Sequence, residues 1–282
     1  MYTLAALCAI GAEKFLGTEL KRLGFALNGG APGRVYFSAD AAGMYRANLC
    51  LRIADRVFLQ AAAFDAPEFD ALFDGVYAAP WQDLLRKDSR IIVDKVRTNR
   101  SALASEHTVQ AMVHKGIYKK LGDKWHMATL PETGDTAAVR VYIDGDRARI
   151  MLDLSGEPLH KRGYRTQGGI APLRETVAAA LIQMALWRRK TPLHDPFCGA
   201  GTIPSEALLY ALDAAPGFGR CFALERLPFF DPRLAAQIRR EEAAKIRTDV
   251  LFRITGSDMD NGAVERARLN AEHACVTVGR AL

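Results

Sequence analysis

The first sixty residues alternate between strand-like and helix-like spacing of apolar side chains. Residues 2–10 and 33–37 show the strand pattern, and residues 12–23 and 40–48 place apolar side chains every three to four positions, as helices do. Gly24 directly follows the first helical stretch, where it would end the helix. The order of these elements predicts a small α+β unit at the start of the chain.

A second set of elements is predicted up to residue 154. The pattern predicts helices over residues 69–76, 81–85 and 105–121, and strands over residues 90–96, 138–143 and 147–154. Asp144-Gly145-Asp146 supplies a tight turn between the last two strands, which predicts a hairpin. Residues 96–101, before the long helix, carry hydroxyl and amide groups that we expect to cap that helix.

The most informative stretch lies further along, where a short apolar strand ends in an acidic, glycine-rich turn that opens into a helix. Gly199 and Gly201 permit a tight turn with a close approach to a ligand, and the helix start offers free N–H groups. A phosphate-binding loop would need Lys where Thr202 stands, and a dinucleotide loop would need Gly where Pro204 stands. With Asp195 before it, the turn favours a ligand with an amino group and a sugar, and we predict S-adenosylmethionine.

A second acid follows the next predicted strand, over residues 252–254. At this place in nucleotide-binding folds a carboxylate accepts both ribose hydroxyls, which is the role predicted for Asp258. A second capping residue for the helix that begins near Asn261 is the alternative. Asp260 is the predicted cap of that helix.

The distribution of charge favours a polyanionic partner. The formal net charge is +6 with a pI near 9.1. Basic residues gather between Arg86 and Lys124 and again over residues 160–165, where Tyr164 lies among cations. Both clusters precede the glycine-rich turn, so we predict a separate RNA-holding module. An ordinary solvated helix surface is the alternative for the lysines of the long helix.

Composition adds few constraints. The 282 residues exceed a usual single domain, 49% are hydrophobic and 25% charged, as expected of a multidomain globular enzyme. The five cysteines are scattered and the histidines isolated, so neither a disulfide framework nor a metal site is expected. We expect a cytoplasmic protein without a signal peptide or membrane span.

The motif Asp-Pro-Phe-Cys-Gly-Ala-Gly-Thr at residues 195–202 resembles the first cofactor motif of class I methyltransferases that methylate amino groups. With residues 168–181, residues 254–260 and the insertion at 216–225, the chain is similar over nearly its whole length to bacterial 23S ribosomal RNA guanine-N2 methyltransferases with a THUMP RNA-binding domain. This resemblance implies a ferredoxin-like domain (1–60), a THUMP domain (61–165) and the N-terminal part of a Rossmann-like class I methyltransferase domain (166–282).

The resemblance also implies site residues. For the cofactor these are Arg174, Thr176, Asp195, Pro196, Phe197, Cys198, Gly199, Gly201, Thr202, Asp258 and Met259. For RNA they are Arg97, Asn99, Arg100, Lys115, Lys119, Lys120, Lys161, Arg162, Tyr164 and Arg165. Helix initiation explains Arg174 and Thr176 equally well, and Cys198 is expected to pack inertly rather than act as a nucleophile.

Amino-methylating enzymes grip the target amine with an Asn/Asp-Pro-Pro-Tyr type tetrapeptide, which this sequence lacks. We therefore expect the chain to be a fragment of a longer protein, inactive by itself, and assign no catalytic residues. The implied activity is methyl transfer to an exocyclic base amine, guanine N2 of 23S ribosomal RNA or its large-subunit precursor. An N6-adenine-specific DNA methyltransferase and a non-catalytic RNA-binding protein with a degenerate methyltransferase domain remain as alternatives.

Overall fold

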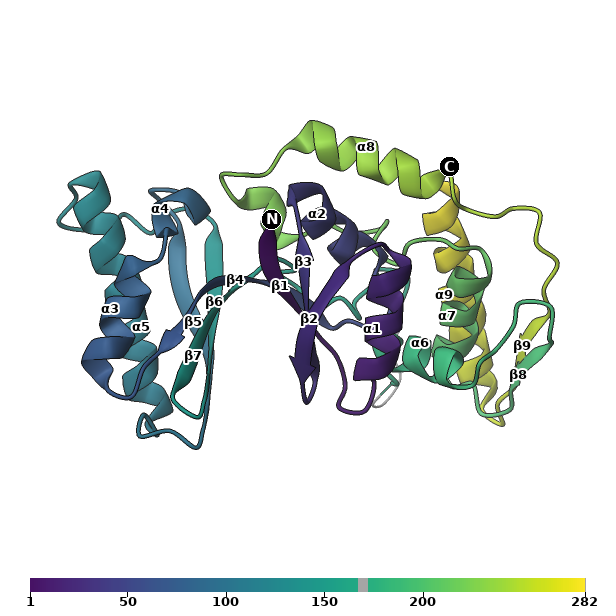
Figure 1. Cartoon of the computed structure of the whole chain (residues 1–282). Helices are drawn as coiled ribbons and strands as arrows, with labels where there is room; N and C mark the ends of the chain where they lie inside the picture. Colours follow the sequence, from purple (N-terminus) through teal and green to yellow (C-terminus); the bar gives the residue numbers. More distant parts are fainter. Residues whose placement is uncertain (167–171, 282) are drawn as a thin grey trace.

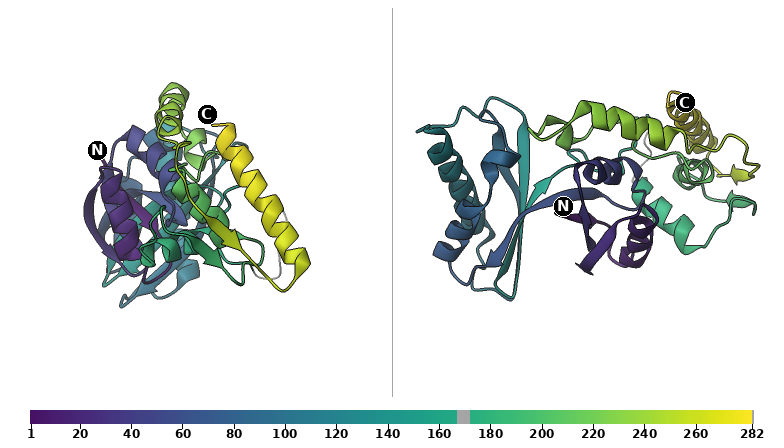
Figure 2. Two further views of the ribbon diagram at one scale, coloured as in Figure 1. Left: turned by 90° about the vertical axis from the view of Figure 1, so that its right-hand side faces the viewer. Right: turned by 45° about the horizontal axis from the view of Figure 1, so that its top comes forward.

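The computed structural model describes residues 1–166 and 172–281, and its elements form three units in a row (Figures 1 and 2). The first unit lies in the middle. Its elements are β1 (Tyr2–Leu7), α1 (Glu13–Arg22), β2 (Ala26–Ala31), β3 (Arg34–Ala39), α2 (Ala41–Cys50) and β4 (Arg56–Asp65). The helices predicted at 12–23 and 40–48 are confirmed as α1 and α2, and Asp40 caps α2 by accepting a hydrogen bond from the Gly43 N–H.

The second unit extends the same sheet. It comprises α3 (Phe69–Ala78), α4 (Trp81–Leu84), β5 (Arg90–Asn99), α5 (Glu106–Trp125), β6 (Thr136–Asp144) and β7 (Arg147–Asp153). The seven strands run in the order β2-β3-β1-β4-β7-β6-β5, with β5 parallel to β6 and the other neighbours antiparallel. The predicted hairpin is confirmed, since Asp144 pairs with Arg147 across its turn.

The third unit contains the glycine-rich turn. It comprises α6 (Glu175–Met184), β8 (Leu193–Asp195), α7 (Thr202–Ala211), the 3-10 helix η1 (Ala223–Arg226), α8 (Pro232–Ala243), β9 (Ile254–Gly256) and α9 (Asn261–Gly279). Strands β8 and β9 are parallel neighbours. The first part of the predicted motif at residues 168–181 lies outside the described residues, and α6 forms its remainder.

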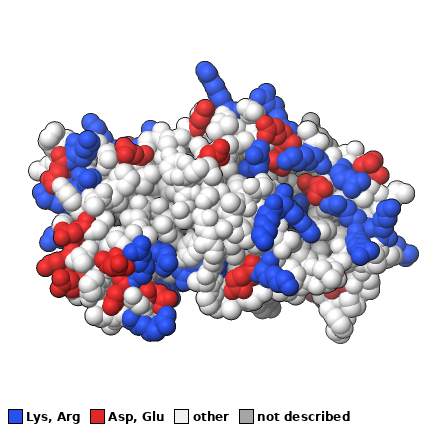
Figure 3. Space-filling model, viewed as in Figure 1, with Lys and Arg blue, Asp and Glu red and all other residues white. Residues whose placement is uncertain are grey.

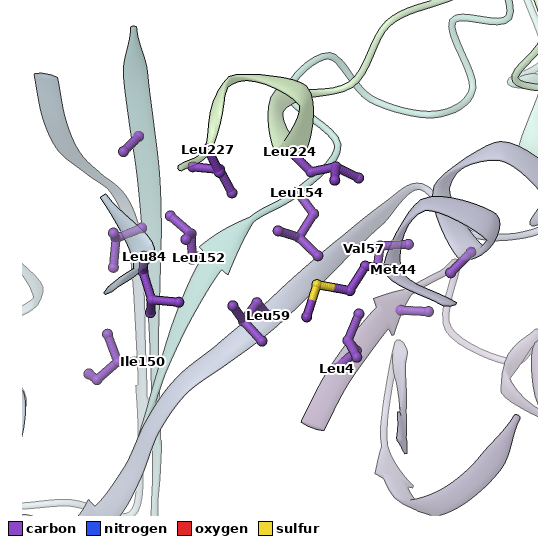
Figure 4. Packing of buried hydrophobic residues seen from close by; sticks show 14 of the residues in the cluster. Leu4, Met44, Val57, Leu59, Leu84, Ile150, Leu152, Leu154, Leu224 and Leu227 are labelled. Carbon is purple, nitrogen blue, oxygen red and sulfur yellow. The ribbon is translucent and has the colours of Figure 1, made fainter. Parts of the chain in front are cut away.

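The insertion at residues 216–225 ties the third unit to the other two. The Gly217 N–H donates to the Leu49 carbonyl, and the Leu224 N–H donates to that of Leu154. Leu224 and Leu227 join the main hydrophobic core, as Figure 4 shows. One apolar cluster therefore spans all three units, which favours a fixed arrangement between them.

Two strands escaped prediction for identifiable reasons. The edge strand β2 contains two consecutive glycines and is largely exposed, so it lacks an apolar alternation. In the central strand β4, Val57 and Leu59 join the main core while Phe58 packs on the opposite face of the sheet. Burial on both faces removes the period-two pattern on which strand prediction depends.

The predicted cap of the long helix is wrong. Strand β5 continues to Asn99, whose side chain donates to Asp144 on the neighbouring strand. The N-cap of α5 is Ser105, which accepts a hydrogen bond from the Thr108 N–H at 3.3 Å. The hydroxyl and amide groups of residues 96–101 are engaged within the sheet and its following turn, too far along the chain from the helix start.

Candidate nucleotide-cofactor site

The parallel pairing of β8 and β9 brings the two predicted acids to one edge. Asp195, the last residue of β8, lies opposite Gly256, the last residue of β9. Asp258 follows two residues later, and its carboxylate accepts a hydrogen bond from the Gly199 N–H at 2.9 Å. The carboxyl ends of parallel strands are where nucleotide folds bind their ligands. The strand pairing thus places Asp258 against the glycine-rich turn.

Further backbone hydrogen bonds fix the turn. The Cys198 N–H donates to the Ser257 carbonyl and the Ser257 N–H to the Asp195 carbonyl, both at 2.9 Å. The Gly201 N–H donates to the Cys198 carbonyl at 2.8 Å. Both strand ends and the start of α7 are therefore held in one rigid arrangement.

The two glycines serve different purposes. Both have left-handed backbone angles, with φ of 52° at Gly199 and 76° at Gly201. A Cβ on Gly201 would lie 2.8 Å from the Cβ of Ala267 on α9, whereas one on Gly199 would have nothing within 4 Å. Gly201 therefore allows α7 and α9 to pack, and Gly199 leaves open space at the turn, where a ligand can approach the backbone.

The exposed groups at this edge suit a nucleoside ligand. Hydrogen bonds from the N–H groups of Asp260 and Gly199 lower the pKa of the half-buried Asp258, which keeps it an ionised acceptor. Two large apolar side chains beside it are left in solvent, Phe197 at 87% exposure and Met259 at 100%. An acceptor for sugar hydroxyls with apolar side chains beside it matches the chemistry of a ribose and its base. The residues present fit S-adenosylmethionine.

The remaining predicted cofactor residues lie deeper. Cys198 is buried, and burial followed by the charges of Asp195 and Asp258 raises its pKa, so its thiol stays protonated. Thr202 is buried at the first position of α7, where its hydroxyl accepts a hydrogen bond from Arg165. The inert role expected of Cys198 fits this environment.

Arg174 and Thr176 face the first unit. The Thr176 hydroxyl donates to an Asp55 oxygen at 2.6 Å, and Thr176 is buried. Arg174 is the N-cap residue of α6, and its guanidinium lies 3.9 Å from Asp55. These contacts give both residues a structural role between α6 and the first unit, and their contact with the cofactor stays a prediction.

Asn270 is a site-supporting residue that sequence reasoning missed. It lies on α9, is 0% exposed, and its side-chain amide donates to the Ala200 carbonyl at 3.0 Å within the glycine-rich turn. Its oxygen accepts from the Thr166 N–H. The sequence offered one signal for this role. Asn270 falls at the helical spacing of the buried apolar residues Ala263, Ala274 and Val278, which indicates a buried polar side chain.

Two of the predicted RNA contacts are wrong. Arg162 is 3% exposed and its guanidinium donates to the Leu159 carbonyl, the Arg52 carbonyl and Glu206. Tyr164 is 3% exposed and its hydroxyl donates to Glu206. Neither side chain can reach a nucleic acid, because Arg162 bridges the first and third units and Tyr164 packs inside the third unit. Arg165 is also predicted to contact RNA. Its guanidinium donates to the Thr202 hydroxyl at the start of α7, directly after the glycine-rich turn.

The other predicted RNA residues are on the surface, but most of the cations are paired. Lys and Arg occur at both ends of the face in Figure 3, mixed with Asp and Glu, and the middle is largely uncharged. Ion pairs join Arg97 to Glu106, Arg100 to Asp144, Lys119 to Asp123 and Lys161 to Glu157. Lys115 and Lys120 lie over the rings of Phe73 and Tyr77 and have no carboxylate partner in the described part of the chain. These two lysines are therefore cations of α5 whose charge no carboxylate neutralises.

No group of three or more metal-ligating side chains occurs among residues 1–166 and 172–281. Nor is any helix in these ranges long and apolar enough to cross a membrane.

A ferredoxin-like unit joined to a Rossmann-like nucleotide site defines the class of protein. Residues 3–58 match the family model described as the RlmL ferredoxin-like domain, and residues 162–280 match the RMKL-like methyltransferase domain. The chain belongs to the RMKL-like methyltransferase family.

Individual relatives agree with this assignment. The chain is 39% identical to "Putative RNA methyltransferase YpsC" of Bacillus subtilis, with 97% of this chain and 71% of that protein covered. It is 35% identical to "Ribosomal RNA large subunit methyltransferase K/L" of Aliivibrio fischeri, with 96% of this chain covered but only 39% of the relative.

Solved structures show the same fold. A Listeria monocytogenes protein described as a predicted N6-adenine-specific DNA methylase has a TM-score of 0.93 at 38% identity, covering 98% of this chain and 72% of that one. SMU.472, solved in complex with SAH, has a TM-score of 0.89 at 36% identity, covering 98% and 73%.

Proposed function

We propose that this protein is a ribosomal RNA methyltransferase that uses S-adenosylmethionine to methylate an exocyclic base amine, guanine N2 of 23S ribosomal RNA. The observation that carries the proposal is the glycine-rich turn held by Asp258, with open space at Gly199. Support for the substrate class comes from the names of the Bacillus and Aliivibrio relatives. Support for the cofactor comes from the SAH complex of SMU.472, since SAH is the demethylated form of S-adenosylmethionine.

The proposed cofactor contacts follow from the geometry of the turn. Asp258 accepts the ribose hydroxyls with the hydrogen-bonding capacity left by its two backbone donors. Phe197 and Met259 flank the base, and the N–H groups at the start of α7 face the ligand. Asp195 is the last residue of β8, followed by Pro196, and is proposed to bind the amino group of the cofactor. The bound cofactor supplies the electrophilic methyl group, and the chain's own residues hold and orient it.

We further propose that the second unit is a THUMP domain that holds structured RNA. The α5 cations Lys115 and Lys120 lie over aromatic rings of α3 without a carboxylate partner among the described residues, and the net charge of +6 favours association with a polyanion. Lys119, Arg97, Asn99, Arg100 and Lys161 are proposed to contribute phosphate contacts by exchanging their present partners for RNA. The domain boundaries at residues 60 and 165 belong to this proposal, although β4 pairs with strands of both units.

The proposed location is the cytoplasm. All five cysteines lie within the described residues and are free, as expected in a reducing compartment. Ribosomal RNA is also found there, so the enzyme and its substrate would share a compartment.

Calorimetric titration with SAH tests the cofactor site. We expect saturable binding by the unchanged chain, and a dissociation constant roughly 10- to 100-fold higher for Asp258→Asn, because a ribose acceptor loses its charge. Asp249→Asn, in the loop before β9, is a control that removes one carboxylate away from the turn. Equal affinity of Asp258→Asn and the unchanged chain would contradict the ribose role.

Methyl transfer from labelled S-adenosylmethionine tests the substrate class. The natural full-length protein should label ribosomal RNA and leave duplex DNA unlabelled. Labelling of duplex DNA at adenine would instead support the description given to the Listeria structure. Cofactor and RNA binding without any labelling would support the binding-protein alternative.

A further inference from the structure

A cluster of buried and half-buried polar side chains lies beside the start of α7, which follows the glycine-rich turn. The Arg165 guanidinium donates to the Thr202 hydroxyl at 2.7 Å and to the Leu173 carbonyl at 2.8 Å, and it lies 3.2 Å from a Glu175 oxygen. Thr202 immediately follows Gly201, and Glu175 is the first residue of α6. A single arginine therefore connects the starts of α6 and α7.

The first unit extends this cluster through Asp55. This residue lies between α2 and β4, and its carboxylate accepts the Thr176 hydroxyl proton at 2.6 Å. His160 and Arg174 lie 3.6 Å and 3.9 Å from the same carboxylate. The start of α6 is therefore held by Asp55 at Thr176 and by Arg165 at Glu175.

A third contact holds the N-terminal half of α7. The side chain of Glu206 is 0% exposed, 3.4 Å from the Arg162 guanidinium, and it accepts the Tyr164 hydroxyl proton at 3.1 Å. Arg162 also donates to the Arg52 carbonyl of the first unit. Both ends of the segment that carries Gly199 and Gly201 are thus connected to the first unit by polar contacts.

We infer that Arg165 and Asp55 are positioning residues for the cofactor turn, so that affinity for S-adenosylmethionine depends on the contact between the first and third units. This inference rests on the proposed function. Neither side chain belongs to the set predicted to touch the cofactor. Their effect is on the direction of α7 and of the N–H groups at its start, and small displacements of such groups weaken binding.

A purely structural role is the competing explanation. Buried ion pairs commonly contribute little net stability, and breaking one destabilises a fold wherever it lies. A loss of stability would therefore not distinguish the two explanations. Cofactor affinity and the local protection of the turn would distinguish them.

The matched control is Arg46, which also joins the first unit to the third. Its guanidinium donates to Glu242 at 2.9 Å and contacts Glu241, linking α2 to α8 away from the glycine-rich turn. Arg46→Met and Arg165→Met each remove one interdomain arginine and keep its aliphatic stem. Asp55→Ala removes the contact with Thr176 of α6.

The experiment measures three quantities on the full chain: the melting temperature, the dissociation constant for SAH, and hydrogen–deuterium exchange of residues 193–205 without ligand. We expect Arg165→Met and Asp55→Ala to raise the dissociation constant roughly tenfold, within the usual range of site coupling. The turn should exchange faster in both variants. Arg46→Met should lower the melting temperature with affinity within about twofold of the unchanged chain.

Arg165→Lys provides a conservative check. Lysine keeps the charge beside Glu175 but cannot reproduce the fork that reaches both Thr202 and the Leu173 carbonyl, so affinity should recover only in part. Unchanged affinity and exchange in Arg165→Met and Asp55→Ala would overturn the inference. An unchanged chain that does not bind SAH would overturn the proposed cofactor role, and unaltered exchange in the variants would then overturn the positioning role separately.

Discussion

At the scale of single residues, the two glycines of the turn are needed for different reasons: Gly201 for helix packing and Gly199 for access of a ligand to the backbone. Both occupy the left-handed region, where a side chain costs about 1–2 kcal/mol. Only at Gly201 does a Cβ also meet the neighbouring helix, where Ala267 approaches to 2.8 Å. The same substitution should therefore have different consequences at the two positions.

We predict that Gly201→Ala destabilises the protein by about 2–5 kcal/mol, because overpacking adds about 1–3 kcal/mol to the backbone strain. Gly199→Ala should cost only about 1–2 kcal/mol of folding free energy. It should still reduce SAH affinity strongly, because the methyl group enters the open space at the turn. Urea unfolding and calorimetry measure the two effects. Similar stability losses in both variants would refute the distinction.

At the scale of elements, the cap of α5 shows where local chemistry decides a boundary. Ser105 accepts the Thr108 N–H, while Ser101 accepts the Leu103 N–H in the preceding turn. Both serines precede the same helix, but only Ser105 satisfies one of its free N–H groups. The helix start therefore depends on one of two similar residues.

We predict that Ser105→Ala lowers the free energy of unfolding by about 1 kcal/mol, the usual cost of losing an N-cap. Ser101→Ala should have less than about half that effect, since it caps no helix. Chemical unfolding followed by circular dichroism measures both. A larger loss from Ser101→Ala would restore the cap position expected from the sequence.

At the scale of the whole molecule, the contact between units should depend on pH through Asp55. Burial acts to raise the pKa of this carboxyl, but the neighbouring His160 ring and the hydrogen bond from the Thr176 hydroxyl outweigh it and hold the pKa below its ordinary value. An acid with a lowered pKa in the folded state contributes stability above its unfolded pKa. That contribution is lost as the pH falls through the lowered value.

The difference in unfolding free energy between the unchanged chain and Asp55→Ala should therefore include the whole contribution of the Asp55 charge at pH 7. The contribution from the Asp55 charge should decline as the pH falls below about 4, near the ordinary carboxyl pKa. Denaturant titrations over a pH series measure this difference. A pH-independent difference would show that the charge of Asp55 does not contribute.

Association with RNA is also a property of the whole molecule. The double variant Lys115→Gln, Lys120→Gln should weaken RNA binding at low salt. It should also reduce the slope of log affinity against log salt by roughly 1.4–1.8, since each phosphate contact contributes about 0.7–0.9. Lys14→Gln, Lys21→Gln on α1 removes equal charge from the first unit as the control. Equal losses in both double variants would indicate a general effect of net charge.

Local sequence determined most helices, the hairpin and the glycine-rich turn, because helical spacing, a short turn motif and glycine chemistry act over a few residues. The family followed from the motif at residues 195–202, which the matching family models confirm. Asp260 was predicted as a cap and accepts the Gly262 N–H at the start of α9.

Only the tertiary structure decided the roles that depend on distant neighbours. Arg162 and Tyr164 belong to a basic, aromatic stretch typical of RNA binding. Both nevertheless donate hydrogen bonds to the buried Glu206, more than forty residues further along the chain. Asn270 and Asp55 gain their roles from segments that the sequence places far apart. Burial and partner geometry arise from the packing of all three units, so a local pattern of charge cannot distinguish a cation exposed to RNA from one enclosed between domains.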